Sequence, residues 1–393
     1  MHHRVLIVGG GAAGLTVAAR LRRAAPAVDV AVLEPSEVHD YQPLWTLVGG
    51  GVVAKERSRR READVMPAGV TWLRDAAAEL RPAERTVVSA ADERIGYDAL
   101  VVACGLRLDW DAIPGLREAL DGGGACSIYG YEHAERTWEA LRSFAGGTAV
   151  FTMPSPPIKC AGAPQKIAYL ADDALRRRGI RDRSRIVYAT ATPSIFSVPH
   201  YAPALERVVA RRGIDARYRH ELVAVRPAAR EAVFRDGDGS ETVLAYDLLH
   251  AVPPQGPPPV VADSPLADAA GWVEVDRHTL QHPRHPEVFA LGDASSLPTS
   301  KTAAAVRAQA PVLVQNLLRR LGERDAPEAR YDGYAACPVV TGYGRLVLAE
   351  FDYDLRPRPT FPFDQRRERR SMYALKRYGL PALYWRGMLR GRA

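Results

Sequence analysis

The fold of this chain is decided by residues 4–14, which read RVLIVGGGAAG. The apolar run Val5 to Val8 predicts a buried strand, and a helix is expected from about Ala12 to Ala24. A second apolar strand follows at Val28 to Leu33. This strand–helix–strand order predicts an α/β protein with a parallel sheet and a right-handed crossover.

The turn between the first strand and its helix has the spacing of a dinucleotide site. Gly9, Gly11 and Gly14 form a GxGxxG pattern, and Glu34 ends the following strand. The glycines permit a tight turn, close approach of the backbone to a pyrophosphate and close helix packing, and the acid accepts hydrogen bonds from a ribose. The helix N-terminus adds free N–H groups for phosphate. The pattern alone does not separate FAD from NAD.

A distant aspartate favours FAD. The buried strand Val288 to Leu291 ends at Gly292 and Asp293. An acid at this place suits hydrogen bonding to a ribityl chain, and only an extended FAD molecule needs a second contact so far along the chain. The structural alternative for Asp293 is a helix cap or an Asx-turn.

A second α/β unit lacks the features of a nicotinamide site. Its strand Thr148 to Met153, its helix from about Gln165 to Arg178 and its strand Ile186 to Ala189 are clear in the sequence. The turn after the first strand has no glycine cradle and instead carries Cys160, and no carboxylate follows the second strand. We therefore expect that NAD(P)H is not the electron donor, and that sulfur chemistry replaces it.

Four cysteines are available for that chemistry, and they differ in their surroundings. They show neither a CxxC motif nor zinc spacing, so no metal site is expected. A cysteine is most often a small buried hydrophobe, and Cys104 and Cys126 fit that description. Lys159 and Lys166 lie close to Cys160 in sequence, and nearby cations lower a thiol pKa.

Bulk properties set the remaining limits. The 393 residues suffice for two or three domains, and the net charge of +7 indicates an anionic partner, with no motif that favours nucleic acid. No secretory signal and no membrane-spanning run are visible. We expect two Rossmann-like dinucleotide-binding domains and a C-terminal region: a discontinuous FAD-binding domain at 1–113 and 250–325, a second domain at 114–249, and a membrane-interface region at 326–393.

The C-terminal segment predicts contact with a membrane. Residues 366–393 contain nine Lys or Arg against one acid, Glu368. Tyr384 and Trp385 each precede an apolar residue by one helical turn, and Gly379 and Pro381 divide the segment into two short amphipathic pieces. A packed, solvated helix is the alternative. We expect a peripheral protein on the cytoplasmic face of a bacterial inner membrane. A second charge run, residues 55–62, is interpreted as a solvated loop.

Several long strings resemble the sulfide:quinone oxidoreductase family, in the branch that holds the mitochondrial enzyme and bacterial relatives. The matching stretches are residues 158–166, 297–306, 331–334, 337–338, 348–353, 360–365 and 371–373.

The resemblance implies roles for individual residues. Cys160 and Cys337 correspond to the redox-active pair, with Cys160 facing the flavin and Cys337 carrying persulfide sulfur. Lys301 is interpreted as a surface lysine rather than a partner of reduced flavin. The FAD contacts implied are Ala12, Ala13, Glu34, Gln42, Ala77, Asp293, Ala303, Ala304, Ala305 and Val306, beside the glycines of the first turn.

The resemblance also implies the reaction. Hydrogen sulfide is oxidised to sulfane sulfur, which passes to a small acceptor such as glutathione or sulfite, or forms polysulfide. The electrons pass through FAD to a membrane quinone. Three alternatives stay open: an NADH:quinone-type or ferredoxin-type reductase, a flavocytochrome-type sulfide dehydrogenase, and a flavin-binding redox sensor without catalysis.

Overall fold

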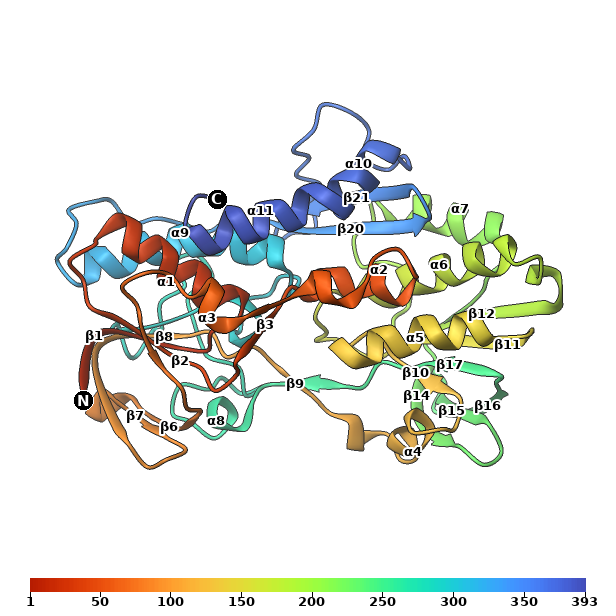
Figure 1. The fold of residues 1–393 in the computed structure, drawn as a ribbon, viewed down its shortest axis with the longest axis horizontal. Coiled ribbons are helices and arrows are strands. Elements are labelled where there is room, and N and C mark those ends of the chain that lie inside the picture. The colour runs from red at the N-terminus through yellow and green to blue at the C-terminus, as the bar shows by residue number, and fades with distance from the viewer.

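The computed structural model describes residues 1–393 and holds two largely parallel sheets side by side (Figure 1). The first sheet has the order β5-β2-β1-β8-β7-β6, and β19 pairs with β8. Its strands are β1 (His2–Val8), β2 (Val30–Leu33), β5 (Thr71–Leu73), β6 (Ala77–Arg81), β7 (Thr86–Ser89), β8 (Arg94–Val102) and β19 (Val288–Ala290). A strand from residues 288–290 therefore completes a sheet that the first 102 residues begin.

Two helices cover one face of this first sheet. They are α1 (Ala12–Ala24) and α9 (Ala303–Arg320), which pack against each other. The strands beneath them are buried because both faces are covered, as expected for parallel strands with continuous apolar sequence. The helix predicted from about Ala12 to Ala24 and the strand predicted after it are confirmed as α1 and β2.

The second sheet is also parallel, with the order β10-β17-β11-β12-β13. Its strands are β10 (Ala125–Cys126), β11 (Gly147–Met153), β12 (Ser184–Thr190), β13 (Asp215–Tyr218) and β17 (Leu248–His250). Its helices are α4 (Leu116–Leu120), α5 (Tyr131–Ser143), α6 (Ala163–Arg177) and α7 (Ala202–Arg212). An antiparallel sheet lies beside it, formed by β14 (Glu221–Arg226), β15 (Glu231–Arg235) and β16 (Glu241–Ala245).

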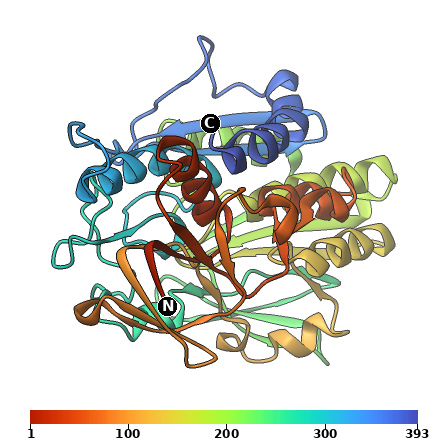
Figure 2. The same cartoon turned by 60° about the vertical axis from the view of Figure 1, so that its left-hand side comes forward.

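The C-terminal part lies across both units, above the helices (Figures 1 and 2). It consists of the hairpin β20 (Ala335–Gly342) and β21 (Arg345–Phe351), then α10 (Arg370–Ala374) and α11 (Leu380–Arg386). Strand β20 packs against α6 of the second unit and α9 of the first. The hairpin thus joins the two units directly.

Short elements connect these layers. They are β3 (Val38–Asp40), β4 (Arg59–Arg61), β9 (Arg107–Leu108), β18 (Gln255–Gly256), α2 (Trp45–Gly49), α3 (Glu62–Val65) and α8 (Pro259–Ala262). The solvated loop expected at residues 55–62 is wrong, because it contains β4 and ends at Glu62, a side chain only 1% exposed.

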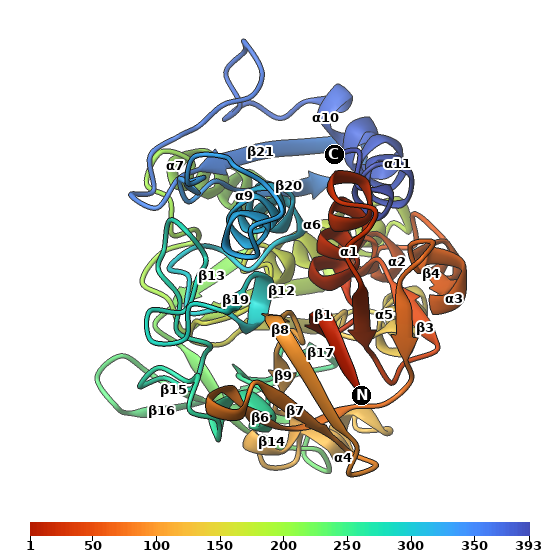
Figure 3. The same cartoon turned by 90° about the vertical axis from the view of Figure 1, so that its left-hand side faces the viewer.

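The C-terminal helices differ from the prediction in two ways. A π-helical turn, Leu375–Gly379, links α10 to α11, so Gly379 and Pro381 do not divide the segment. Pro381 is the second residue of α11, directly after the π-helical turn. Tyr384, Met388 and Leu389, expected to face lipid, are instead buried, in the part of the chain that lies beside α1 (Figure 3). No helix combines the length and the apolarity that crossing a bilayer demands.

Candidate functional site

The turn after β1 has the shape of a cradle for a phosphate group. Gly9 has φ +103°, and a Cβ on it would lie 2.6 Å from the carbonyl oxygen of Ala103. A Cβ on Gly14 would collide with the carbonyl oxygen of Gly9, so α1 packs as closely as glycine allows. A Cβ on Gly11 would meet nothing within 4 Å, which leaves open space in front of the helix.

The N-terminus of α1 faces this space with its hydrogen-bond donors free. No side chain caps it, and its first turn, which begins with Ala12 and Ala13, contains no acid. These N–H groups and the helix dipole therefore remain available to an anion. Glu34 holds the turn in place, because its carboxylate accepts the N–H of Gly10 and the N–H of Ser36, both at 2.7 Å.

Three distant segments converge beside α1. Gly292 has φ +68°, and a Cβ on it would lie 3.1 Å from Ala13 and 3.4 Å from Val306. Asp293, the next residue, makes no side-chain hydrogen bond within the protein, and burial raises its pKa. A buried carboxylate without a partner is costly, so its position is suited to a ligand that donates hydrogen bonds.

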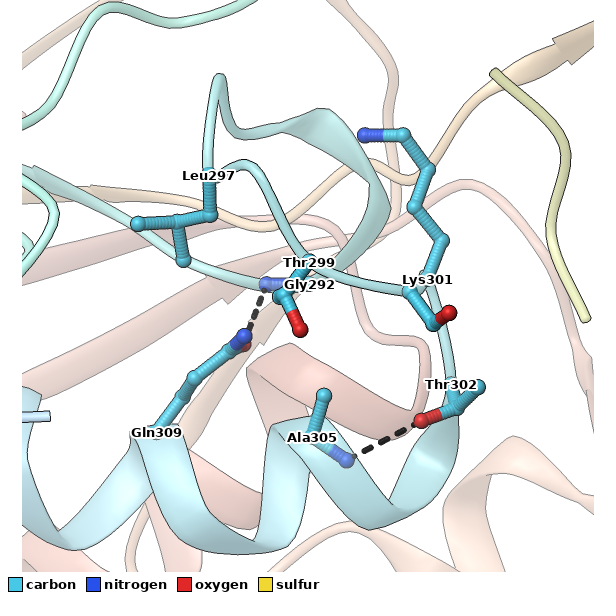
Figure 4. A pocket seen from close by; sticks show the side chains of 8 residues that line it. Gly292, Leu297, Thr299, Lys301, Thr302, Ala305 and Gln309 are labelled. Carbon is cyan, nitrogen blue, oxygen red and sulfur yellow. Dashed lines mark hydrogen bonds between the residues drawn. The ribbon is translucent and has the colours of Figure 1, made fainter. Parts of the chain in front are cut away.

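The start of α9 lines a pocket next to this point (Figure 4). The side chain of Thr302 accepts the N–H of Ala305 at 3.1 Å and caps the helix. Gln309 accepts the N–H of Gly292 at 2.9 Å, which fixes the turn against α9. The pocket is lined by Gly292, Leu297, Thr299, Ser300, Lys301, Thr302, Ala305 and Gln309. Ala303 and Ala304 are half-buried in the first turn of the same helix.

Lys301 is half-buried, so its interpretation as a free surface lysine is wrong. Its Nζ donates to the carbonyl oxygens of Asp293 at 2.7 Å and Ser295 at 3.1 Å. It also lies 3.9 Å from the centroid of the Trp272 ring. Burial lowers the pKa of Lys301 to about 8.

These features fit FAD. The turn from Gly9 to Gly14 would hold the diphosphate, and Asp293 would accept from the ribityl chain. Two further buried donors have no partner, the indole N–H of Trp45 and Nε2 of Gln255, and both residues lie beside Lys159. They were not found from the sequence, because neither residue belongs to a motif.

Two more of the residues expected at the cofactor lie on other elements. Gln42 is exposed in the turn before α2, and its side chain makes no hydrogen bond. Ala77 begins β6 at the edge of the first sheet, paired with Ser89.

Cys160 lies where the two units meet. Its backbone N–H donates to the carbonyl oxygen of Lys301 at 3.0 Å, and its own carbonyl oxygen accepts from Ala163 at 2.7 Å, at the start of α6. Its φ is +50°, an uncommon conformation for a residue with a Cβ. The turn after β11 therefore presents a half-buried thiol toward the pocket side of the first unit.

The structure brings Cys337 to the same place from β20. Cys337 is buried, and a Cβ on Gly162 would lie 2.5 Å from its Sγ. Only glycine leaves room there for the sulfur. The two thiols interact by a hydrogen bond, which lowers the pKa of Cys160 and raises the pKa of Cys337.

Two buried lysines surround this pair. Lys166 Nζ donates to Cys160 Sγ at 3.2 Å, which also favours the Cys160 thiolate. Lys376 comes from the π-helical turn of the C-terminal segment, and its Nζ donates to the carbonyl oxygen of Pro43 at 2.8 Å. Burial lowers the pKa of Lys376 to about 7, while the two sulfurs act in the opposite direction. Nothing in the sequence near Lys376 indicated this position.

The other two cysteines differ from this pair. Burial raises the pKa of both Cys104 and Cys126 to about 12, so neither holds a thiolate near neutral pH. The second unit also has no acid where a nicotinamide ribose would need one. Strand β12 ends at Thr190, whose hydroxyl pairs with that of Thr192 at 2.8 Å.

Comparison with known proteins shows which family the chain resembles. The family model of pyridine nucleotide-disulphide oxidoreductases matches residues 3–140. The chain is 46% identical to the mitochondrial sulfide:quinone oxidoreductase of Mus musculus over 392 residues, covering 99% of this chain and 87% of that protein. It is also 46% identical to the mitochondrial enzyme of Dictyostelium discoideum, covering 99% of this chain and 86% of the relative.

Solved structures agree on the fold. The sulfide:quinone oxidoreductase of Aquifex aeolicus superposes with a TM-score of 0.84 at 20% identity, covering 100% of this chain and 92% of that one. The α/β fold with two parallel sheets is therefore that of flavoproteins with two dinucleotide-binding domains. Because its identity to two curated relatives is 46% over almost its whole length, the chain belongs to the sulfide:quinone oxidoreductase family.

Proposed function

We propose that the chain oxidises hydrogen sulfide at Cys160 and Cys337 and delivers the electrons through FAD to a quinone. The observation that carries this proposal is the pair of interacting thiols, with Lys166 bonded to one of them, beside the turn at Gly292 and Asp293. The proposal gives the discontinuous domain, residues 1–113 and 250–325, the cofactor, and gives residues 114–249 the thiol Cys160. Residues 326–393 supply Cys337 and Lys376.

The first step uses a disulfide bridge between the two cysteines. Hydrosulfide attacks the sulfur of Cys337, the bridge breaks, and Cys160 leaves as a thiolate while Cys337 becomes a persulfide. Thiol exchange is faster when the leaving thiol has the lower pKa, and the pKa of Cys160 is lowered by its hydrogen bond to Cys337 and by Lys166. The lowered pKa of Cys160 therefore supports attack at Cys337.

The second step returns both cysteines to the thiol state. A small acceptor, such as glutathione or sulfite, attacks the outer sulfur on Cys337 and takes it away, which leaves two electrons on the cysteine pair. FAD, held by the turn from Gly9 to Gly14 and by Asp293, would supply the two-electron acceptor needed for the cysteines to form the bridge again, and the route of the electrons to a quinone. The cations Lys166 and Lys376 attract the anionic sulfur compounds and stabilise the Cys160 thiolate.

The proposed membrane contact lies on the face of the C-terminal helices that is exposed. Tyr378 is 54% exposed and Leu383 is 38% exposed, whereas the face with Tyr384 packs inward. Two apolar side chains among basic residues suit a peripheral helix in an anionic lipid interface. Two of the matched relatives are mitochondrial by name, so we propose a quinone-bearing membrane surface without assigning the bacterial cytoplasmic face.

The reaction is tested by anaerobic addition of sulfide, with sulfite as the acceptor, to the purified holoenzyme. Sulfide should bleach the flavin absorbance, a soluble ubiquinone analogue should restore it, and NADH should leave it unchanged. Cys160→Ser and Cys337→Ser should each retain FAD but lose bleaching by at least about a hundredfold, because neither variant can form the bridge.

The matched control is Cys126→Ser, which alters a buried cysteine that has no role in the proposal. This variant should bleach at the wild-type rate. Normal bleaching by either redox-pair variant, or bleaching of the wild type by NADH, would contradict the proposal.

A further inference from the structure

A second cavity lies at the opposite end of α6 from the cysteine pair. It has a volume of about 410 Å³ and is lined by Asp173, Arg176, Arg177, Arg211, Arg212, Tyr343 and Arg345. The turn between β20 and β21 lies next to α6 and α7 (Figure 1), and the backbone N–H of Tyr343 in this turn donates to Asp173 of α6. Because 13 residues of α-helix span about 20 Å, the last turns of α6 lie about that far from the end near Cys160. The cavity is therefore separate from the sulfur site.

The charge of this cavity is strongly positive. Five arginines line it, and the three carboxylates that pair with them are Asp172, Asp173 and Glu368. Arg177 has no carboxylate partner, since its guanidinium lies 3.9 Å over the ring of Tyr343. An excess of two positive charges therefore remains in a space that has no aliphatic side chain in its lining.

One of the five arginines, Arg212, is buried in the wall of the cavity. Arg212 is 7% exposed, and its Nη1 donates to Asp172 at 2.6 Å and to Asp173 at 2.7 Å. Asp173 in turn accepts the backbone N–H of Tyr343 at 2.6 Å. Nε of Arg212 is buried and has no hydrogen-bond partner, and its Nη2 makes no hydrogen bond. This edge of the arginine fork therefore has no partner within the protein.

We propose that this cavity binds a phosphate group. The arginine fork, the surplus positive charge and the polar lining match phosphate better than an apolar ligand or a quinone. The volume lies in the range of small-molecule sites, so a diphosphate or a nucleotide fits. Four of the five arginines are exposed, which gives a ligand access from solvent. The phosphate comes either from a soluble phosphate ester or from a phospholipid headgroup.

The test measures binding to the holoenzyme at low ionic strength. Inorganic pyrophosphate and ATP are titrated by calorimetry, and phosphatidylglycerol vesicles are compared with phosphatidylcholine vesicles by flotation. Arg177→Ala should weaken pyrophosphate binding roughly tenfold, as loss of one charged hydrogen bond does. Arg212→Ala should weaken it further. Arg177 is exposed and unpaired with any acid, so its variant keeps the test valid if Arg212→Ala does not fold.

The matched control is Arg226→Ala, which removes the same charge from an exposed arginine paired with Glu231 at 2.9 Å, outside the cavity. It should bind pyrophosphate like wild type, and all variants should keep normal sulfide-dependent bleaching. Weaker pyrophosphate binding with unchanged flotation assigns a soluble ligand, whereas a matching loss of flotation on phosphatidylglycerol assigns a lipid headgroup. Absence of pyrophosphate and ATP binding to wild type, or an equal loss in Arg226→Ala, would overturn the proposal.

Discussion

At the scale of single residues, the reactive thiol is defined by what surrounds Cys160. The left-handed backbone conformation of Cys160 costs roughly 1 kcal/mol of conformational free energy. Two backbone hydrogen bonds stabilise it: Cys160 donates to Lys301 and accepts from Ala163. That conformation places the sulfur between Cys337 and Lys166. The sequence pointed to Cys160 and to Lys166 because both lie in one short segment.

The sequence does not identify Lys376 as a residue of the site. It lies in the basic C-terminal segment, where one lysine among nine Lys or Arg has no distinguishing neighbour. Only the fold turns it inward, where it is 4% exposed and close to both cysteines. Long-range packing, rather than any local pattern, therefore decides which cation of the segment serves the site.

The depressed pKa of Lys376 predicts a pH-dependent contribution. Its charge is present below pH about 7 and is lost as the pH rises through that value, because burial disfavours the charged form. Wild type should reduce its flavin about tenfold faster than Lys376→Met at pH 6, and the ratio should approach one at pH 8.5. Stopped-flow bleaching gives both rates at each pH, so the ionisation of sulfide cancels in the ratio.

A ratio that stays constant across this range would contradict the assignment. Lys55→Met is the control, since Lys55 pairs with Glu132 and Glu135 on the surface. Its rate should equal that of wild type at every pH.

At the scale of elements, a buried chain of polar groups fixes the C-terminal helix. His39 accepts or donates at both ring nitrogens, to Glu62 at 3.1 Å and to the hydroxyl of Tyr384 at 2.5 Å. The Tyr384 ring also packs on Tyr41, with the centroids 4.4 Å apart. This chain connects α11 to the strand β3 and to α3.

Tyr384→Phe should loosen α11 without removing its ring. Loss of a buried hydrogen bond costs about 1–3 kcal/mol, so amide hydrogens of residues 380–390 should exchange roughly 5- to 100-fold faster. Tyr378→Phe is the matched control, because that side chain is 54% exposed. Mass spectrometry of amide exchange measures both, and equal protection in the two variants would contradict the role of Tyr384.

Elements with strong periodicity were predictable, and those formed by distant contacts were not. Helix α1 follows from the glycine turn and the apolar run, and its range is as expected. The C-terminal helix was also expected, but the buried face was misjudged, since aromatic residues at helical spacing suit lipid and protein alike. The sequence around Glu62 predicts a solvated charge run, because the partner of Glu62 is His39, which lies on β3, distant in sequence.

At the scale of the whole molecule, the proposed reaction site draws on all three parts of the chain. Asp293 comes from the first unit, Cys160 from the second, and Cys337 from the hairpin that packs on both. The C-terminal helices that supply Lys376 also present the exposed apolar residues Tyr378 and Leu383. The proposed membrane contact and the proposed sulfur chemistry therefore share one segment.

That arrangement predicts which surface substitution weakens membrane binding. Leu383→Glu should reduce flotation of the holoenzyme with anionic vesicles about tenfold, because it places a negative charge on the proposed lipid face. Val243→Glu changes a residue of similar exposure, 42%, on β16, and should float like wild type. Bleaching by sulfide in solution should be unchanged in both, and unaltered flotation of Leu383→Glu would place the contact elsewhere.

The central claim is that sulfide sulfur becomes attached to Cys337 while Cys160 leaves as a thiolate. The most direct measurement is anaerobic reaction of the oxidised enzyme with one equivalent of sulfide, rapid alkylation, and peptide mass spectrometry. We predict one additional sulfur on the Cys337 peptide and an alkyl group on Cys160, with Cys104 and Cys126 unmodified. Additional sulfur on Cys104 or Cys126, or on no cysteine at all after this single equivalent without an acceptor, would contradict the account.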